Sequence, residues 1–241
     1  MIRKIEKNKK ASMDFQRFER DASMLINCAI PHGKEIVCEG PSTTETRYDL
    51  SNRIHEAANQ IVSNILTEGK AHWCININPK EDSEPLFCFR PREHPVQGFK
   101  TIPMIIRSRD IGIPYKHIRS LTKRLRHSEF PLSDLTLLKF DIDRNRIADR
   151  WGHALSWHMS DPSVFTDACI LLNQCNKKLL AIETCKAVET AMNKALSKSG
   201  FSDYRVTIPT YSKEKLESSK KRYIEGNLEE EAFNNLVFSC V

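Results

Sequence analysis

A long stretch of regularly spaced apolar residues marks the first half of the chain. From Leu50 to Leu66 the apolar positions recur every three or four residues, and Gly69 follows them. This spacing predicts one amphipathic helix that ends at a glycine. An earlier stretch, 13–26, shows the same spacing and stops at the Pro-His-Gly sequence of 31–33, so a second helix is expected there.

A second apolar stretch marks the C-terminal half. It runs over 165–196, opens with Asp161 and Pro162 and closes at Gly200. Asp followed by Pro is a good helix start, because the carboxylate can cap the helix and proline is tolerated at its first position. Since 173–178 is polar, we expect two helices with a break there.

Alternating apolar and polar residues between the two stretches predict strands. Residues 73–77 and 86–89 alternate around a polar connection, as in an antiparallel hairpin. Residues 101–106 are also strand-like, but Pro103 restricts that strand to a sheet edge. The other elements expected from the pattern are strands at 35–38 and 204–208, a basic helix near 115–126, a short element at 133–140, a polar helix near 144–157, a charged helix ending at Gly226 and a terminal helix.

These elements predict an α+β fold, with strands before residue 110 and a mainly helical C-terminal half. We expect three regions: a basic flexible arm (1–12), an α+β region (13–112) and a mainly helical region (113–241). The apolar surface of 165–196 could pack within the chain or against a second copy, so a homo-oligomer is a possible assembly.

Composition indicates a globular protein. The chain has 241 residues, of which 40% are hydrophobic and 28% charged, enough to form a core. No window is apolar enough for a membrane helix or a secretory signal, so we expect a cytoplasmic protein without a membrane partner. The eight cysteines are expected as thiols. The group His72, Cys74 and Cys88 lies in strand-like sequence, where cysteine behaves as a small core residue rather than a zinc ligand.

Positive charge is unevenly distributed along a chain of net charge +6. It concentrates in 3–10, 107–126 and 220–222, and such clusters suit contacts with the phosphates of nucleic acid. The alternative is a set of solvated helix faces. The residues expected to contact DNA are Arg107, Arg109, Lys116, Arg119, Arg124, Arg144 and Arg146.

The segment 137–154 resembles a pattern found in tyrosine recombinases of the phage integrase type. It reads Leu-Leu-Lys-Phe-Asp-Ile-Asp, continues through a polar helix with a central isoleucine, and ends at Gly152-His153. In that family the histidine contacts the scissile phosphate, and the resemblance gives this role to His153. It also implies double-stranded DNA as the partner and no cofactor.

A basic sequence upstream extends the resemblance. Residues 123–128 are similar to the family's HxxRH box with lysine in place of the first histidine, so Arg126 would be a catalytic arginine. Arginine and histidine donors stabilise the charge that develops when a phosphodiester is attacked. Lys100 or Lys123 would help to protonate the leaving oxygen.

The nucleophile is where the chain departs from the family. A tyrosine is expected about ten residues after the Gly-His pair, and Phe165 stands there instead. Phenylalanine cannot attack phosphorus, while Tyr204, Tyr211 and Tyr223 lie far along the chain. The expectation is therefore a DNA-binding relative of site-specific recombinases, such as a degenerate accessory protein or regulator, whose enzymatic activity the sequence leaves open.

Three alternatives remain. The segment 36–41 is similar to the first motif of Toprim nucleases, so Glu39 with Asp141 and Asp143 could bind Mg²⁺ in a nuclease or nucleotidyltransferase. The spacing of Arg146 and His153 also fits the loose arginine-histidine spacing of HEPN ribonucleases. The other alternative is a non-enzymatic interaction protein whose basic faces are solvated.

Overall fold

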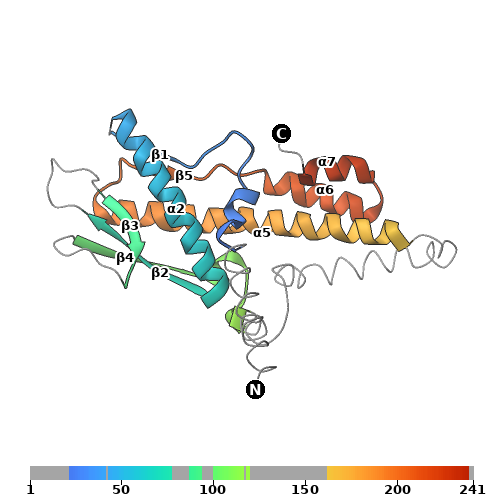
Figure 1. Cartoon of the computed structure of the whole chain (residues 1–241), viewed down its shortest axis with the longest axis horizontal. Helices are drawn as coiled ribbons and strands as arrows, with labels where there is room; N and C mark the ends of the chain where they lie inside the picture. Colours follow the sequence, from blue (N-terminus) through green and yellow to red (C-terminus); the bar gives the residue numbers. More distant parts are fainter. Residues whose placement is uncertain are drawn as a thin grey trace, which may run out of the picture.

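A computed structural model gives the fold and describes residues 22–41, 43–77, 87–93, 100–116, 118–119 and 162–238. Four of the five strands that the structure describes lie in the N-terminal half together with α2, and the C-terminal half is mainly helical, so the chain is an α+β protein (Figure 1). The N-terminal elements are η1 (Leu25–Cys28), β1 (Val37–Glu39), α2 (Thr44–Glu68), β2 (Lys70–Ile77), β3 (Phe87–Pro91), β4 (Lys100–Arg107) and η2 (Ser108–Ile111). The C-terminal ones are α5 (Pro162–Ser199), β5 (Arg205–Thr207), α6 (Lys213–Glu225) and α7 (Glu230–Phe238).

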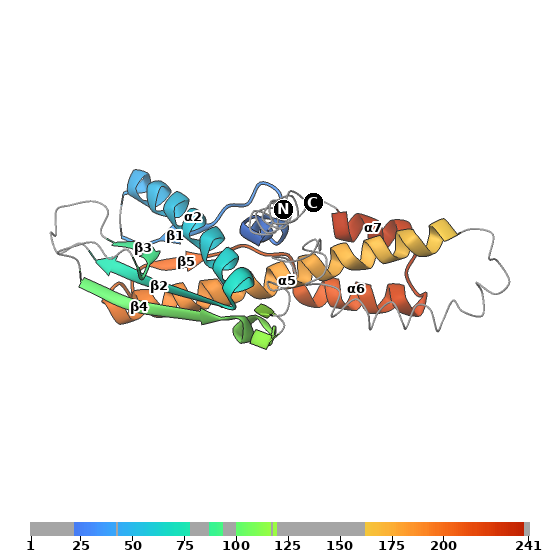
Figure 2. The ribbon, with the colours of Figure 1, turned by 60° about the horizontal axis from the view of Figure 1, so that its bottom comes forward.

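Helix α5 is the central element of the molecule. It has 38 residues, a length of about 57 Å at 1.5 Å per residue. Its first half packs against α6 and α7, and its second half packs against α2 and the strands (Figure 2). Because neighbours surround it on several sides, its buried positions are not restricted to one stripe.

The break expected at 173–178 is wrong, because α5 is one continuous helix from Pro162 to Ser199. Polar side chains in this stretch have partners on other elements. Asn176 accepts a hydrogen bond from Lys220 of α6 at 2.7 Å. The Lys178 ammonium donates to the carbonyl of Val237 in α7 at 3.3 Å and lies 3.5 Å from the centre of the Tyr211 ring. The polar residues therefore attach α6 and α7 to α5.

The strands form two antiparallel sheets. In the three-stranded sheet the order is β3-β2-β4, with Ile75 opposite both Phe89 and Ile102. This confirms the hairpin expected from the alternation. It also confirms the position of Pro103, since β4 is an edge strand in the described sheet.

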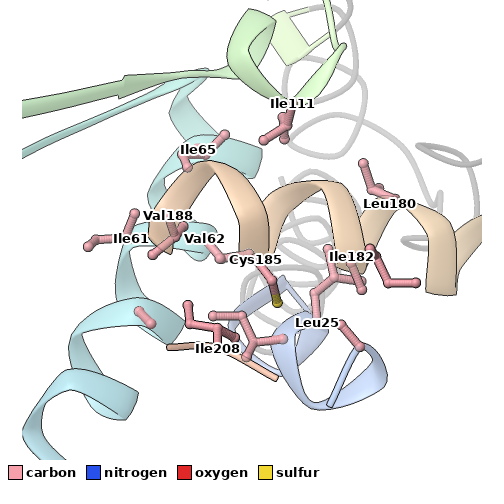
Figure 3. Packing of buried hydrophobic residues seen from close by; sticks show 14 of the residues in the cluster. Leu25, Ile61, Val62, Ile65, Ile111, Leu180, Ile182, Cys185, Val188 and Ile208 are labelled. Carbon is pink, nitrogen blue, oxygen red and sulfur yellow. The ribbon is translucent and has the colours of Figure 1, made fainter. Parts of the chain in front are cut away.

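The inner face of this sheet packs on α2 and α5. Ala71, Trp73 and Ile75 of β2 are buried there with Met104 and Ile106 of β4. Figure 3 shows how the core continues through Ile61, Val62 and Ile65 of α2, Ile111 of η2, and Cys185 and Val188 of α5. One cluster of buried residues thus joins elements from both halves of the chain, while the expected boundary at residue 112 stays a prediction.

The second sheet pairs segments from opposite ends of the described chain. Strand β1 pairs with β5, with Cys38 opposite Val206. Two side chains of α5 provide further partners: Asn193 bonds both the N–H and the carbonyl of Val206 at 2.8 Å, and Glu189 accepts from the N–H of Ile208 at 2.7 Å. The helix therefore fixes the position of a very short sheet.

The helix expected at 13–26 is described only from residue 22, and η1 at Leu25–Cys28 is a 3-10 helix. The ends expected for three other helices are confirmed. Helix α2 ends before Gly69, α5 begins at Pro162 and ends before Gly200, and α6 ends before Gly226. The three glycines have positive φ, as expected after a helix. In the described ranges, no helix combines the length and the apolar character needed to cross a bilayer. The arm at 1–12 and the elements expected at 133–140 and 144–157 lie outside the described residues.

Candidate nucleic-acid interface

The site is built around Gly69, where α2 ends and β2 begins. Gly69 has φ +77°, which a residue with a side chain rarely adopts. Its N–H donates to the Ile65 carbonyl at 3.0 Å, and its own carbonyl accepts from the N–H of Ser108 at 2.9 Å. These two bonds hold the end of α2 against the turn that follows β4.

The strand register then places two cations opposite each other. Lys70 of β2 is the Cα partner of Arg107 of β4. Both residues are exposed, whereas their neighbours Ala71 and Ile106 are buried on the inner face. Because side chains alternate along a strand, Lys70 and Arg107 belong to the outer face of the sheet.

The turn after β4 adds a third cation. The N–H of Arg107 donates to a carboxylate oxygen of Asp110 at 2.7 Å, and Ile111 is buried in the core. These contacts fix η2. The Arg109 side chain, 70% exposed, lies 3.9 Å from Asp110 in a loose ion pair, so it keeps much of its capacity to bind another anion.

The helical residues 115–116 and 118–119 complete the site. Ile118 is only 1% exposed and anchors this segment in the core. Tyr115 lies against Gly69, so closely that a methyl group added to the glycine would collide with the ring. Lys116 and Arg119 are exposed beside it. We call the group Lys70, Arg107, Arg109, Lys116 and Arg119 the basic corner.

Positive charge continues from the corner along the outer face of the sheet. Arg90 pairs with Cys74 in the register, and the N–H of Arg92 donates to the His72 carbonyl at 3.0 Å. Burial raises the pKa of the Cys74 thiol, as does the neighbouring Cys88, while the positive charge of Arg92 acts against them. The Arg92 guanidinium is therefore close enough to affect this face electrostatically.

Acidic residues near the corner are fewer than the cations. Asp110 lies within it, and Glu68 is exposed one residue before Gly69. Among the residues that the structure describes, no carboxylate forms an ion pair with Lys70 or Arg107. The corner thus has a net positive charge that a phosphate could neutralise.

The structure brings together four of the residues expected to contact DNA: Arg107, Arg109, Lys116 and Arg119. Lys100 is exposed at the first residue of β4, opposite Ile77, about 23 Å from Arg107 at 3.3 Å per residue. It therefore lies apart from the corner. The other expected residues, Lys123, Arg124, Arg126, Arg144, Arg146 and His153, lie outside the described residues, so their convergence stays a prediction.

The described tyrosines of the C-terminal half have structural roles. Tyr204 is 7% exposed and packs edge-on against Phe87. Tyr223, also 7% exposed, stacks on Phe233 at 4.4 Å between centroids. Tyr211 lies below the Lys178 ammonium. Phe165, which stands at the position expected for the nucleophile, lies in the first turns of α5.

Of the three residues expected in the alternative metal site, the structure describes only Glu39. This residue is exposed on β1, opposite Arg205. The neighbouring Gly40 has a packing role, because any side chain there would collide with the Tyr204 ring. No group of three or more metal-binding side chains suits an ion among the described residues. Asp141 and Asp143 lie outside them.

The third basic run, 220–222 in α6, is engaged locally. Lys220 bonds Asn176, Lys221 lies 3.8 Å from Glu225, and Arg222 donates to the Asn227 carbonyl at 3.2 Å. These cations stabilise the helix and its contact with α5. The interpretation as solvated or structural charges therefore fits the run 220–222 better than it fits the basic corner.

A cavity of about 300 Å³ lies beside α5, lined in part by His32, Lys177 and Lys178. The Lys178 ammonium there already contacts the Val237 carbonyl and the Tyr211 ring. The cavity is lined by residues of η1, α5 and α7, and none of its lining residues belongs to the basic corner.

Sequence reasoning missed Lys70, Arg90, Arg92 and Tyr115. The lysine and arginines are isolated in strand-like sequence, and only the register places them beside Arg107. A signal for Tyr115 existed, because it directly precedes Lys116 in the basic run, and aromatic residues among cations are typical of nucleic-acid contacts. Comparison with protein-family models, curated proteins and solved structures found no match to this chain.

Proposed function

We propose that this chain binds nucleic acid through the basic corner. The observation that carries the proposal is the cross-strand pair of Lys70 and Arg107. Like charges directly opposite each other in a sheet are destabilising. A bound phosphate would remove that cost, because it would accept hydrogen bonds from both cations and release condensed counterions.

The geometry suits a chain of phosphates better than a single anion. The cations come from β2, β4, η2 and the helical residues 116 and 119, and Arg90 and Arg92 continue the positive charge along the sheet. An extended polyanion could contact several of them at once. Such an interface would recognise the backbone rather than the base sequence.

The salt dependence of binding tests this proposal. We expect the triple substitution Lys70→Gln, Arg107→Gln and Lys116→Gln to weaken binding of a labelled oligonucleotide at low salt. For duplex DNA, the slope of log K against log salt should become shallower by about 0.9 for each phosphate that the variant no longer neutralises. Fluorescence anisotropy over a series of NaCl concentrations measures both quantities.

A triple variant elsewhere is the matched control. Lys194→Gln, Lys215→Gln and Lys221→Gln remove the same charge from exposed positions on α5 and α6. Under the proposal, this variant keeps most of the wild-type affinity and slope. Equal weakening in the two variants would mean that overall charge alone matters, and absence of binding by the wild-type chain would refute the proposal.

This proposal concerns binding and does not include strand cleavage. The kinship with tyrosine recombinases, and with it a catalytic role for Arg126 and His153, stays a prediction about residues outside the described ranges. A nucleic-acid ligand agrees with the cytoplasmic location expected from the sequence, because such ligands are present there.

A further inference from the structure

An exposed aromatic ring lies within the basic corner. Tyr115 is 56% exposed, although burying such a ring would be favourable. Lys116 follows it in the chain, and Arg119 lies one helical turn later. The ring also contacts Gly69, and Lys70 directly follows that glycine in the chain. An accessible ring thus belongs to a segment with two cations, and a third cation follows the glycine that the ring contacts.

The ring is also held in place. One part of it lies against Gly69, whose two backbone hydrogen bonds join α2 to the turn after β4. The segment that carries the ring is anchored by Ile118, 1% exposed. Binding a planar group on the remaining exposed surface would therefore cost little ordering entropy.

We propose that Tyr115 stacks on an unpaired base, so that the ligand of the basic corner is single-stranded nucleic acid. This inference rests on the proposed function and specifies its substrate class. Every base has a π-face, so an aromatic ring with neighbouring cations can bind single strands without reading their sequence. In a duplex these faces are covered by adjacent base pairs, and the ring would have no such partner.

Three labelled ligands of equal length separate base stacking from phosphate binding. They are a 15-nucleotide oligo-dT, an abasic strand with the same number of phosphates, and a 15-base-pair duplex. We expect the wild-type chain to bind oligo-dT roughly five- to a hundredfold more tightly than the abasic strand, the range typical of one stacked base. The salt slopes of the two single strands should be similar, because their phosphates are the same.

Variants at position 115 assign the difference to the ring. Tyr115→Leu should lower the affinity for oligo-dT to that for the abasic strand, while the affinities for the abasic strand and the duplex stay unchanged. Tyr115→Phe, which keeps the aromatic face, should retain the preference. Tyr48→Leu removes another exposed tyrosine, 65% exposed on α2, and should have no effect.

The outcomes distinguish this inference from the proposed function. If the wild-type chain binds oligo-dT, abasic strand and duplex equally, or if Tyr115→Leu weakens all three alike, the stacking role is refuted while the phosphate interface stands. If it binds none of them, the proposed function itself fails. If Tyr115→Leu does not fold, equal binding of oligo-dT and the abasic strand by the wild-type chain still refutes the stacking role, and Gly69→Ala, which displaces the ring, tests the assignment to Tyr115.

Discussion

Single polar side chains hold the short sheet in place. Asn193 of α5 acts as a partner for β5, because its amide bonds both the N–H and the carbonyl of Val206. Val206 itself is fully buried, so water could not readily replace these bonds. The pairing of β1 with β5 therefore depends on a residue of a helix.

Substitution Asn193→Ala should destabilise the fold by about 2–3 kcal/mol, since it leaves two buried backbone groups without partners. Urea unfolding followed by circular dichroism measures the change. Thr190→Ala is the control on the same helix. Its exposed hydroxyl bonds only the Lys186 carbonyl within α5, and the expected change is within about 0.5 kcal/mol. Equal effects of the two substitutions would exclude this role for Asn193.

Buried thiols make the free energy of unfolding depend on pH in the alkaline range. Burial raises the pKa of Cys185 from 9.0 to about 12, with smaller contributions from Glu189 and Cys28. Below pH 9 the thiol is protonated in both folded and unfolded chains. As the pH rises from 9 toward 12, the unfolded chain loses this proton first, so the stability contribution is progressively lost.

We therefore expect the unfolding free energy of Cys185→Ala to fall less steeply than that of the wild-type chain between pH 9 and 11. The difference can reach about 1.4 kcal/mol per pH unit, the value for one proton. Urea unfolding under reducing conditions over this pH range tests it. Parallel curves would show that the Cys185 thiol ionises equally in both states.

At the scale of elements, the turn between α2 and β2 affects both the stability of the fold and the position of Tyr115 in the candidate interface. Gly69→Ala would force a side chain into a left-handed conformation and into the Tyr115 ring. Gly200, after α5, also has positive φ, but a side chain there would meet nothing within 4 Å. The two glycines therefore separate the backbone cost from the cost of displacing the ring.

We expect Gly200→Ala to cost about 1–2 kcal/mol from backbone strain alone. Gly69→Ala should cost more and should also weaken binding of the 15-nucleotide oligo-dT, since it displaces Tyr115. Urea unfolding and fluorescence anisotropy measure the two effects. Equal destabilisation by the two substitutions, together with unchanged binding by Gly69→Ala, would contradict the described contact between Gly69 and Tyr115.

The elements also show where sequence patterns suffice. Helix α2 and the β2–β3 hairpin could be predicted because burial on one side imposes a regular spacing of apolar residues. The polar stretch 173–178 of α5 was misleading, since Asn176 and Lys178 find their partners on α6 and α7. A pattern within one segment does not show contacts with distant segments.

At the scale of the whole molecule, pairing between strands far apart in the sequence creates the parts of the site that the sequence could not predict. The pairing of Lys70 with Arg107 depends on the register of β2 with β4, and β1 meets β5 only after the chain has passed through α5. Part of the candidate interface could be predicted because Arg107, Arg109, Lys116 and Arg119 share one basic run. Lys70 joins them only through the fold.

The molecule is long, so a ligand bound at one end would cover only part of its surface. Helix α5 carries the sheets and α2 on one half, and α6 and α7 on the other (Figure 1). The basic corner lies with the sheet, where β2 begins and β4 ends. A ligand bound there would leave the surface of α6 and α7 free.

Hydrogen–deuterium exchange of the full chain, with and without the 15-nucleotide oligo-dT, tests the position of the interface most directly. We predict slower exchange on binding in peptides that cover residues 69–72 and 105–119, and unchanged exchange in residues 213–238. A complex that forms but leaves 69–72 and 105–119 unchanged, with protection at 213–238 or at 137–154 instead, would contradict binding at the basic corner.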